Sequence, residues 1–209
     1  SSLAKIYIPS CITSIGTSAF RSCSLLTEIT IPSSLQSLES YSFRGCSLLR
    51  EIKFPETVKI QEIKEHTFEK CTSLTTISIP QSVRKIGKYS FKDCSALTEL
   101  ELPSSLNAIG ICAFDGCQML KQMAIPSSVT NIESSAFGNC SSLSQVTIPS
   151  SFNYIGDFCF DDCVNLLDVN FSTCEKISNC SSIIGNNAFN NCSSLKQITI
   201  PSSVNLIDE

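Results

Sequence analysis

Cysteine and histidine carry the most reactive side chains in this sequence, and their spacing decides which chemistry is open to them. The chain has 209 residues, with thirteen cysteines and a single histidine, His66. A metal site needs converging ligands, and neither a C-x-x-C motif nor a histidine cluster is present. A catalytic pair needs a nucleophile and an orienting acid; Glu65 and Glu69 lie near His66, but nothing marks a nucleophile. We therefore predict no enzyme, no metal and no cofactor.

The cysteines follow a pattern of their own. Eight of them come three residues after a phenylalanine that recurs at regular intervals, which predicts a column of buried thiols that act as small apolar side chains. Two others, Cys174 and Cys180, bracket the segment "CEKISNC", and a disulfide between them and two reduced thiols are both open readings. Asn179, in the same segment, begins an Asn-Cys-Ser triplet and is a candidate glycosylation site.

A repeat of 23 residues organises the chain. The unit reads L-x-x-I-x-I-P-x-S-V-x-x-I-G-x-x-A-F-x-x-C-x-x, and it recurs eight times over residues 3–194. A partial ninth unit covers 195–209, and two insertions of two and six residues interrupt the period. We predict a single domain over 1–209 that is a fragment of a longer protein.

Each position of the unit has a physical role, which the fifth unit illustrates. The alternation in Leu100-Glu101-Leu102 suits a short strand with one buried face. Pro103 would end that strand, and Gly110 would permit a tight or positive-φ corner. The segment from Ala113 to Cys117 would return the chain, with one turn of helix as an option.

A single such unit cannot bury its own apolar side, whereas stacked units can. The pattern therefore predicts an α/β repeat solenoid, with strands paired in parallel about 4.8 Å apart and a stack roughly 40 Å long. We expect a right-handed, curved stack with one continuous parallel sheet on the concave face and short turns or helical segments on the convex face.

The stretch Leu97-x-x-Leu100-x-Leu102 resembles the strand signature of leucine-rich repeats, L-x-x-L-x-L-x-x-N. The whole unit, with "IPSSV" and "AF..C", is similar to the BspA-like leucine-rich repeat family. That resemblance implies a cell-surface or secreted virulence protein that adheres to host cells or to matrix proteins such as fibronectin or fibrinogen. The usual Asn is replaced here by Ser34, Ser82, Ser105, Ser128, Ser151, Ser203, Thr57, Cys11 or Cys174.

Charge and hydropathy restrict the class of partner. The net charge is −4, and the basic residues alternate with acids instead of forming a stripe, so we predict no nucleic-acid partner. No apolar run is long enough for a bilayer, so we predict no direct membrane insertion. Self-association through uncapped ends of the stack stays an option.

Strand positions that do not enter the core must face outward, and these form the predicted binding surface. The face is polar and of mixed charge, which predicts weak, multivalent contacts with a protein. Rival sites are the column Tyr41–His66–Tyr89, where we expect the imidazole to stack near both rings, and a patch at Tyr154 and Phe158. Alternative functions are a structural spacer or an intracellular interaction scaffold, which unpaired cysteines would favour. The predicted binding residues are Arg50, Glu51, Lys53, Thr76, Ser78, Glu99, Glu101, Lys121 and Gln122.

Overall fold

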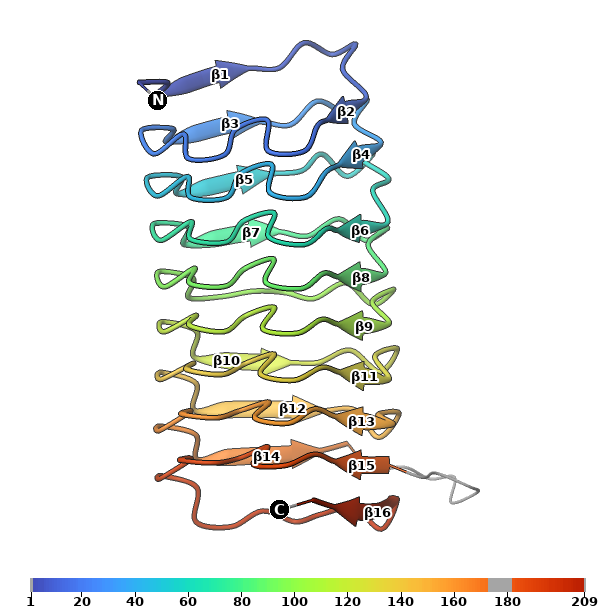
Figure 1. Ribbon diagram of the computed structural model, residues 1–209. Helices are drawn as coiled ribbons and strands as arrows, with labels where there is room; N and C mark the ends of the chain where they lie inside the picture. Colours follow the sequence, from blue (N-terminus) through green and yellow to red (C-terminus); the bar gives the residue numbers. More distant parts are fainter. Residues whose placement is uncertain (1, 173–181, 209) are drawn as a thin grey trace.

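The computed structural model describes residues 2–172 and 182–208, and within them the chain winds into stacked coils (Figure 1). We number the coils by the sequence repeat, so that coil five runs from Leu97 to Met119. All regular structure in the described residues is parallel strand, and none is helix. The predicted solenoid is confirmed, but the helical segments and the α/β class were wrong, because turns occupy the return segment.

One side of the stack, which we call the first face, carries the strands expected from the L-x-x-I-x-I motif. Neighbouring strands pair in parallel with the 23-residue offset, as in Ile6↔Ile29. Within each strand the central residue is the most buried and its neighbours point outward, as the alternation predicted. The strands are β1 (Lys5–Tyr7), β3 (Glu28–Thr30), β5 (Glu51–Lys53), β7 (Thr76–Ser78), β10 (Gln122–Ala124), β12 (Gln145–Ile148) and β14 (Asp168–Phe171).

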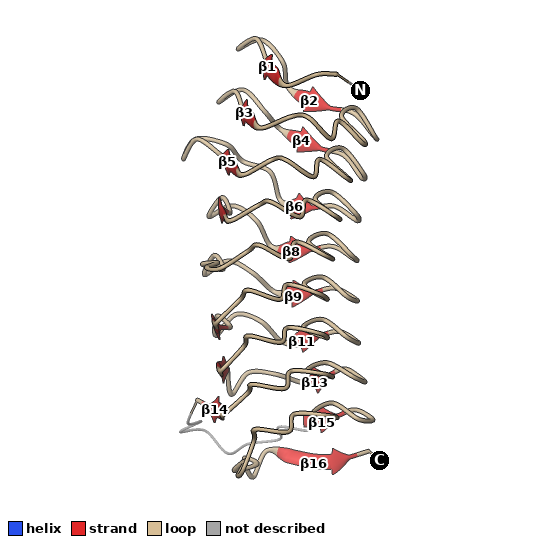
Figure 2. Cartoon of the chain, turned by 90° about the vertical axis from the view of Figure 1, so that its left-hand side faces the viewer, coloured by secondary structure: helices blue, strands red, loops and turns tan. Residues whose placement is uncertain are grey.

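A second set of parallel strands, the second face, runs along the opposite side of the stack (Figure 2). Most of these strands have only two residues, too few to give a periodic pattern in the sequence, and they were not predicted. The strands are β2 (Ser14–Ile15), β4 (Ser37–Leu38), β6 (Glu62–Ile63), β8 (Lys85–Ile86), β9 (Ala108–Ile109), β11 (Asn131–Ile132), β13 (Tyr154–Ile155), β15 (Ser182–Ile184) and β16 (Val204–Ile207).

Because both faces consist of strands stacked at the same spacing, neither is much wider than the other. The coils accordingly form a nearly straight column in Figures 1 and 2, without the marked curvature expected for one sheet opposed by turns. The side chains at the hydroxyl positions bond across coils, as for Ser105 Oγ, which donates to the carbonyl of Val83 at 2.6 Å. Serine at these positions thus donates to a backbone carbonyl of the preceding coil.

Each face is interrupted once. The second face breaks between β4 and β6, where the two-residue insertion lengthens coil three between Val58 and Ile63. The first face breaks between β7 and β10, so the continuous sheet predicted there was wrong. The segment Leu100-Glu101-Leu102, for which alternation predicted a strand, does not form a strand.

The break in the first face has a cause in the sequence of coil five. Among the described residues, no backbone hydrogen bond joins 99–102 to either neighbouring coil. The segment reads Glu-Leu-Glu-Leu, so it has two glutamates and no β-branched residue, whereas β10 (Gln122–Ala124), which lacks a β-branched residue but has no glutamate, still pairs with β12. Glutamate is depleted in strands and β-branched residues are enriched, so this segment has the weaker preference for pairing.

The turn side, which joins the second face back to the first, has a backbone ladder that continues through all eight coils. In coil five the amides of Cys112, Phe114 and Gly116 donate to carbonyls of the next coil at 3.0, 2.8 and 2.9 Å. Each coil has two positive-φ positions here, at Cys112 and Gly116 in coil five. Of the two roles expected for Gly110, the positive φ was wrong, but the site is tight, because a Cβ there would meet the backbone of Gly87 at 2.9 Å.

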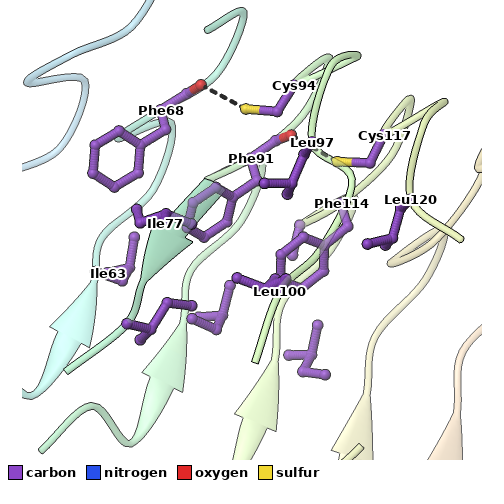
Figure 3. Close-up of a cluster of buried hydrophobic side chains, with 14 of the residues drawn as sticks. Ile63, Phe68, Ile77, Phe91, Cys94, Leu97, Leu100, Phe114, Cys117 and Leu120 are labelled. Atoms are coloured by element: carbon purple, nitrogen blue, oxygen red, sulfur yellow. Dashed lines mark hydrogen bonds between the residues drawn. The ribbon is translucent and has the colours of Figure 1, made fainter. Parts of the chain in front are cut away.

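The repeat phenylalanines form the core under the turn side, stacked with ring centroids 5.2–5.6 Å apart. The cysteine column is buried, as predicted, and it also makes a hydrogen bond. Cys94 Sγ donates to the carbonyl of Phe68 at 3.2 Å, and Cys117 repeats this contact one coil later (Figure 3). That carbonyl already accepts the amide of Cys71, so the thiol satisfies its second lone pair.

Candidate functional site

All nine predicted binding residues are exposed on the first face, in coils three to six. Their orientation follows from the period of two along a strand, which turns the residues on either side of a buried one outward. Parallel register then aligns them across coils, with Glu51 beside Thr76 and Lys53 beside Ser78. The structure therefore brings the predicted residues together on one surface.

Two adjoining hollows lie in this surface, on either side of the break at coil five. The first has a volume of about 290 Å³ and extends from coil three to Glu99 and Glu101. The second, of about 400 Å³, lies between these two glutamates and coil six. Leu100, which is 9 % exposed, lines both hollows. Eight of the nine residues line one hollow or both, and Arg50 lies outside them: Glu51, Lys53, Thr76, Ser78, Glu99, Glu101, Lys121 and Gln122.

The charges around the hollows are only partly paired. Lys53 Nζ lies 3.1 Å from Glu51 Oε1, and both side chains are at least half exposed, so this contact contributes little stability. Within the described part of the chain, Glu99 and Glu101 form no ion pair with a lysine or arginine. These two carboxylates are therefore open to groups on another molecule.

The rival column on the turn side is a stack of three rings. The imidazole of His66 lies between Tyr41 and Tyr89, with ring centroids 4.5 and 4.7 Å apart, which confirms the expected stacking. Arg21 and Arg44 lie near the Tyr41 ring. The flat faces of the inner ring are thus covered, and only ring edges are left for a partner.

His66 also belongs to an ion-pair network. Its Nδ1 contacts Glu69 Oε2 at 2.5 Å, and Arg44 binds the same carboxylate with two hydrogen bonds of 2.6 and 2.9 Å. Burial favours the neutral acid, but the bonds from Arg44 and His66 outweigh it and lower the pKa of Glu69. The carboxylate is only 4 % exposed, so the network fixes the turn side instead of presenting an acid to a ligand.

The remaining candidates divide between the surface and the interior. Phe158 is 41 % exposed and follows β13, which contains Tyr154. Cys174, Cys180 and Asn179 lie outside the described residues.

The thiols of the cysteine column are poor nucleophiles. Desolvation raises the pKa of Cys46 to about 12, and it raises that of Cys71 further above the usual range. Because the thiolate is the reactive form, the column packs the core and is inert. No three described His, Cys, Asp or Glu side chains are grouped as metal ligands would be.

Known families can now be compared with this geometry. The model of the BspA type leucine rich repeat region matches in six copies, over residues 1–96, 61–181 and 175–209. The chain belongs to this family. The resemblance read from the repeat unit is therefore confirmed, and a BspA-type leucine-rich repeat fold is typically a non-catalytic binding scaffold. A search of the curated proteins found no significant match.

Solved structures of leucine-rich repeat proteins share the fold. A leucine-rich repeat protein of T. pallidum is 26 % identical with a TM-score of 0.66, over 93 % of this chain and 79 % of that one. One from Bacteroides ovatus is 26 % identical with a TM-score of 0.55, over 98 % and 71 %. A leucine rich cell surface protein from Faecalibacterium prausnitzii is 22 % identical with a TM-score of 0.59, over 94 % and 64 %.

None of the described residues forms a helix long and apolar enough to cross a bilayer.

Sequence reasoning missed the break that shapes the candidate surface. The signal was present, since Glu99-Leu100-Glu101-Leu102 is the one first-face segment in coils one to five that has neither isoleucine nor valine. Alternation of apolar and polar residues alone predicts a strand here, whereas the low strand preference of its residues disfavours one. The His66–Glu69–Arg44 network was also missed, because Arg44 and Glu69 are 25 residues apart and meet only when the coils stack.

Proposed function

We propose that this chain is a non-enzymatic protein-binding module of a cell-surface or secreted adhesin. Its first face would attach to a host cell or to an extracellular matrix protein of the fibronectin or fibrinogen type. The observation that carries the proposal is the pair of hollows at coil five, which eight of the nine predicted residues line. The adhesive role itself rests on the family resemblance.

Backbone groups support this site in addition to side chains. The strands β7 and β10 pair with β5 and β12, but neither has a partner on the side that faces coil five, and 99–102 has no backbone bond to them. Unpaired strand edges are ready templates for an extended peptide, which supplies the missing donors and acceptors. A partner strand could thus combine main-chain bonds with contacts to Glu99 and Glu101.

The composition of the surface limits its affinity. Interface hot spots are enriched in Trp, Tyr and Arg, and the chain has no tryptophan. The predicted set holds one arginine, Arg50, and otherwise short polar or flexible charged side chains. We therefore expect weak single contacts that become strong when many copies on a cell engage together.

The test is binding of the purified chain to immobilised fibronectin, immobilised fibrinogen and host-cell surfaces. The first-face variant carries Arg50→Glu, Lys53→Glu, Glu99→Lys and Glu101→Lys. Reversed charges on the surface should lower saturable binding by at least about tenfold.

A matched control reverses the same number of charges outside the first face. It carries Glu62→Lys, Glu65→Lys, Arg84→Glu and Lys85→Glu, so its net charge is also unchanged. Binding that survives in the first-face variant and fails in the control would move the site away from the first face. No saturable binding by folded wild-type chain would reject adhesion to these ligands.

A second candidate is an intracellular interaction scaffold. The eleven cysteines in the described residues are all free, and free thiols are typical of reducing compartments. Counting thiols on the unfolded protein separates the two, because thirteen free thiols favour the scaffold and eleven favour export with Cys174 bonded to Cys180.

A further inference from the structure

Coils five and six are joined unevenly around the column. On the turn side, three amides of coil five donate to coil six, and on the second face β9 pairs with β11. Where the turn side meets the first face, the amide of Ser142 donates to the carbonyl of Gln118 at 3.1 Å. On the first face itself, the described backbone of the two coils shares no hydrogen bond. Backbone bonds therefore restrain this junction on every side except the proposed binding surface.

The two neighbouring junctions are more firmly joined on the first face. Between coils six and seven, β10 and β12 pair in parallel over three residues, and the amides of Ser144 and Ile125 add bonds of 2.9 and 3.0 Å. Between coils four and five, the amide of Thr98 donates to the carbonyl of Thr75 at 3.2 Å. Separating coils six and seven on the first face would break several bonds, whereas separating coils five and six there breaks none of those described.

The core beneath this part of the first face is also less closed. Leu102 is only partly buried, whereas Ile79 and Ile125, at the same position in coils four and six, are each 5 % exposed. The inward residue of β10 is Met123, whose unbranched side chain adapts to irregular space. The packing under the first face can therefore follow a change in the spacing of coils five and six.

The turn side fixes the axis about which the spacing can change. The ring of Phe114 stacks on Phe91 and on Phe137 with centroids 5.2 and 5.3 Å apart, and all three rings are fully buried. These rings and the amide ladder hold the coil spacing on the turn side, and the continuous pairing of β8, β9 and β11 holds it on the second face. A tilt of one coil on the other therefore opens or closes the first face alone.

We infer that coil five is a hinge, at which the column bends toward and away from the first face. The first-face strands of coils one to four form one paired sheet and those of coils six to eight another, so each half moves as a unit. Tilting the halves apart widens the hollows beside Glu99 and Glu101 and separates the free edges of β7 and β10. The inference does not depend on the proposed binding function, but it would set the width of that site.

Double electron–electron resonance between paired nitroxide labels measures the bending without any partner. Each label is attached to a ketone-bearing amino acid, so the thiols of the chain are not modified. One pair replaces Lys53 and Thr147 on the first face, and the matched pair replaces Gln61 and Asn153 beside β6 and β13. Both pairs span four coil spacings across coil five, or about 19 Å. The first-face distance distribution should be about twice as wide as the other, because hinge motion displaces most the labels that lie far from the axis.

Restoring strand preference in coil five tests the cause of the hinge. The variant Glu99→Thr/Leu100→Ile/Glu101→Ser should narrow the first-face distribution to the width found on the second face, because the segment can then pair. A milder repair, Glu99→Thr/Glu101→Ser, keeps the core residue Leu100 and should narrow it in part. Circular dichroism shows that each variant is folded, and the second-face distribution should stay unchanged. A wild-type first-face distribution as narrow as the second-face one, or one that neither folded repair narrows, would overturn the inference.

Discussion

The two sides of coil five differ more than any two sides of another complete coil. On the turn side three amides, those of Cys112, Phe114 and Gly116, bond to coil six, and the Phe114 ring stacks on both neighbours. On the first face of the same coil, residues 99–102 bond to neither neighbouring coil. The turn side therefore holds the stack together where the sheet does not.

Within one repeat, the turn side holds neighbouring coils together, and the first face carries the proposed binding surface. Continuous hydrogen bonds and buried rings resist opening, whereas a segment with exposed polar groups and few backbone bonds opens at low cost. Binding surfaces are usually drawn from segments of the second kind.

Alkaline pH should unfold the column through the turn side. Burial raises the pKa of Cys46 to about 12 and that of Cys192 to about 11, while an unfolded thiol titrates near its usual value. The contribution of each thiol is thus complete below the unfolded pKa, and it is lost as pH rises toward the folded pKa. Each buried thiol should lower the free energy of unfolding by about 1.4 kcal/mol per pH unit in that window.

Urea unfolding under reducing conditions at pH 7, 8.5 and 10 measures this loss. The control is Cys94→Ala, which removes one buried thiol and should make the decline with pH less steep. A free energy of unfolding that stays level to pH 10 would contradict the burial of the thiols.

Truncating one core side chain on each side of coil five compares the two sides directly. Phe114→Ala removes a fully buried ring from the stack and should cost about 4 kcal/mol. Leu100→Ala, beside the hollows, should cost nearer 2 kcal/mol, because its surroundings can relax. Urea midpoints of the two variants, with slopes compared to confirm two-state unfolding, test the ranking; equal costs would mean that the break does not loosen the core.

The thiol hydrogen bond makes a smaller contribution that can be isolated. Cys94→Ala should cost about 1–2 kcal/mol at pH 7, because it leaves the Phe68 carbonyl with one acceptor site unfilled and a small cavity. The matched control is Cys11→Ala, at an exposed position in coil one, which should change stability by less than about 0.5 kcal/mol. Thermal unfolding of both variants beside wild type gives the comparison.

Repairing the break should have the smallest effect on stability and the clearest effect on local order. The variant Glu99→Thr/Leu100→Ile/Glu101→Ser gives coil five the first-face sequence of coil four. It should add about 1 kcal/mol by raising strand preference and removing two like charges on one face. Hydrogen exchange at the amides of residues 100–102 should slow, while exchange at Phe114 stays unchanged.

The repeat made much of this fold predictable, for reasons that particular residues show. Phe114, Cys117 and Leu120 recur at a fixed spacing and enter the core, because a stacked coil must bury the same positions each time. The outward direction of Lys53 and Glu99 follows from alternation alone. The second face escaped prediction because a two-residue strand such as Lys85–Ile86 depends on its neighbours in the next coil and leaves no local period.

The candidate site was predictable as a set of residues but not as a shape. Alternation placed Glu101 and Gln122 on one surface, yet the hollow between them depends on a strand that fails to pair. The sequence difference behind this is small: Glu99, Leu100 and Glu101 stand where coil four has Thr76, Ile77 and Ser78, and the first set has the lower strand preference. The contact of Arg44 with Glu69 was likewise set by stacking, because the two residues are 25 apart in the sequence.

The position of the coil-three insertion defines how this architecture can vary. Two extra residues enter between Val58 and Ile63 and cost only one pairing in the second face, while the turn-side ladder passes through coil three unbroken. The six-residue insertion of the eighth repeat also precedes a second-face strand. The stretch ahead of each second-face strand is thus the position where the repeat tolerates insertions and deletions. The turn-side hydrogen bonds keep the register of the coils when a loop is gained or lost there.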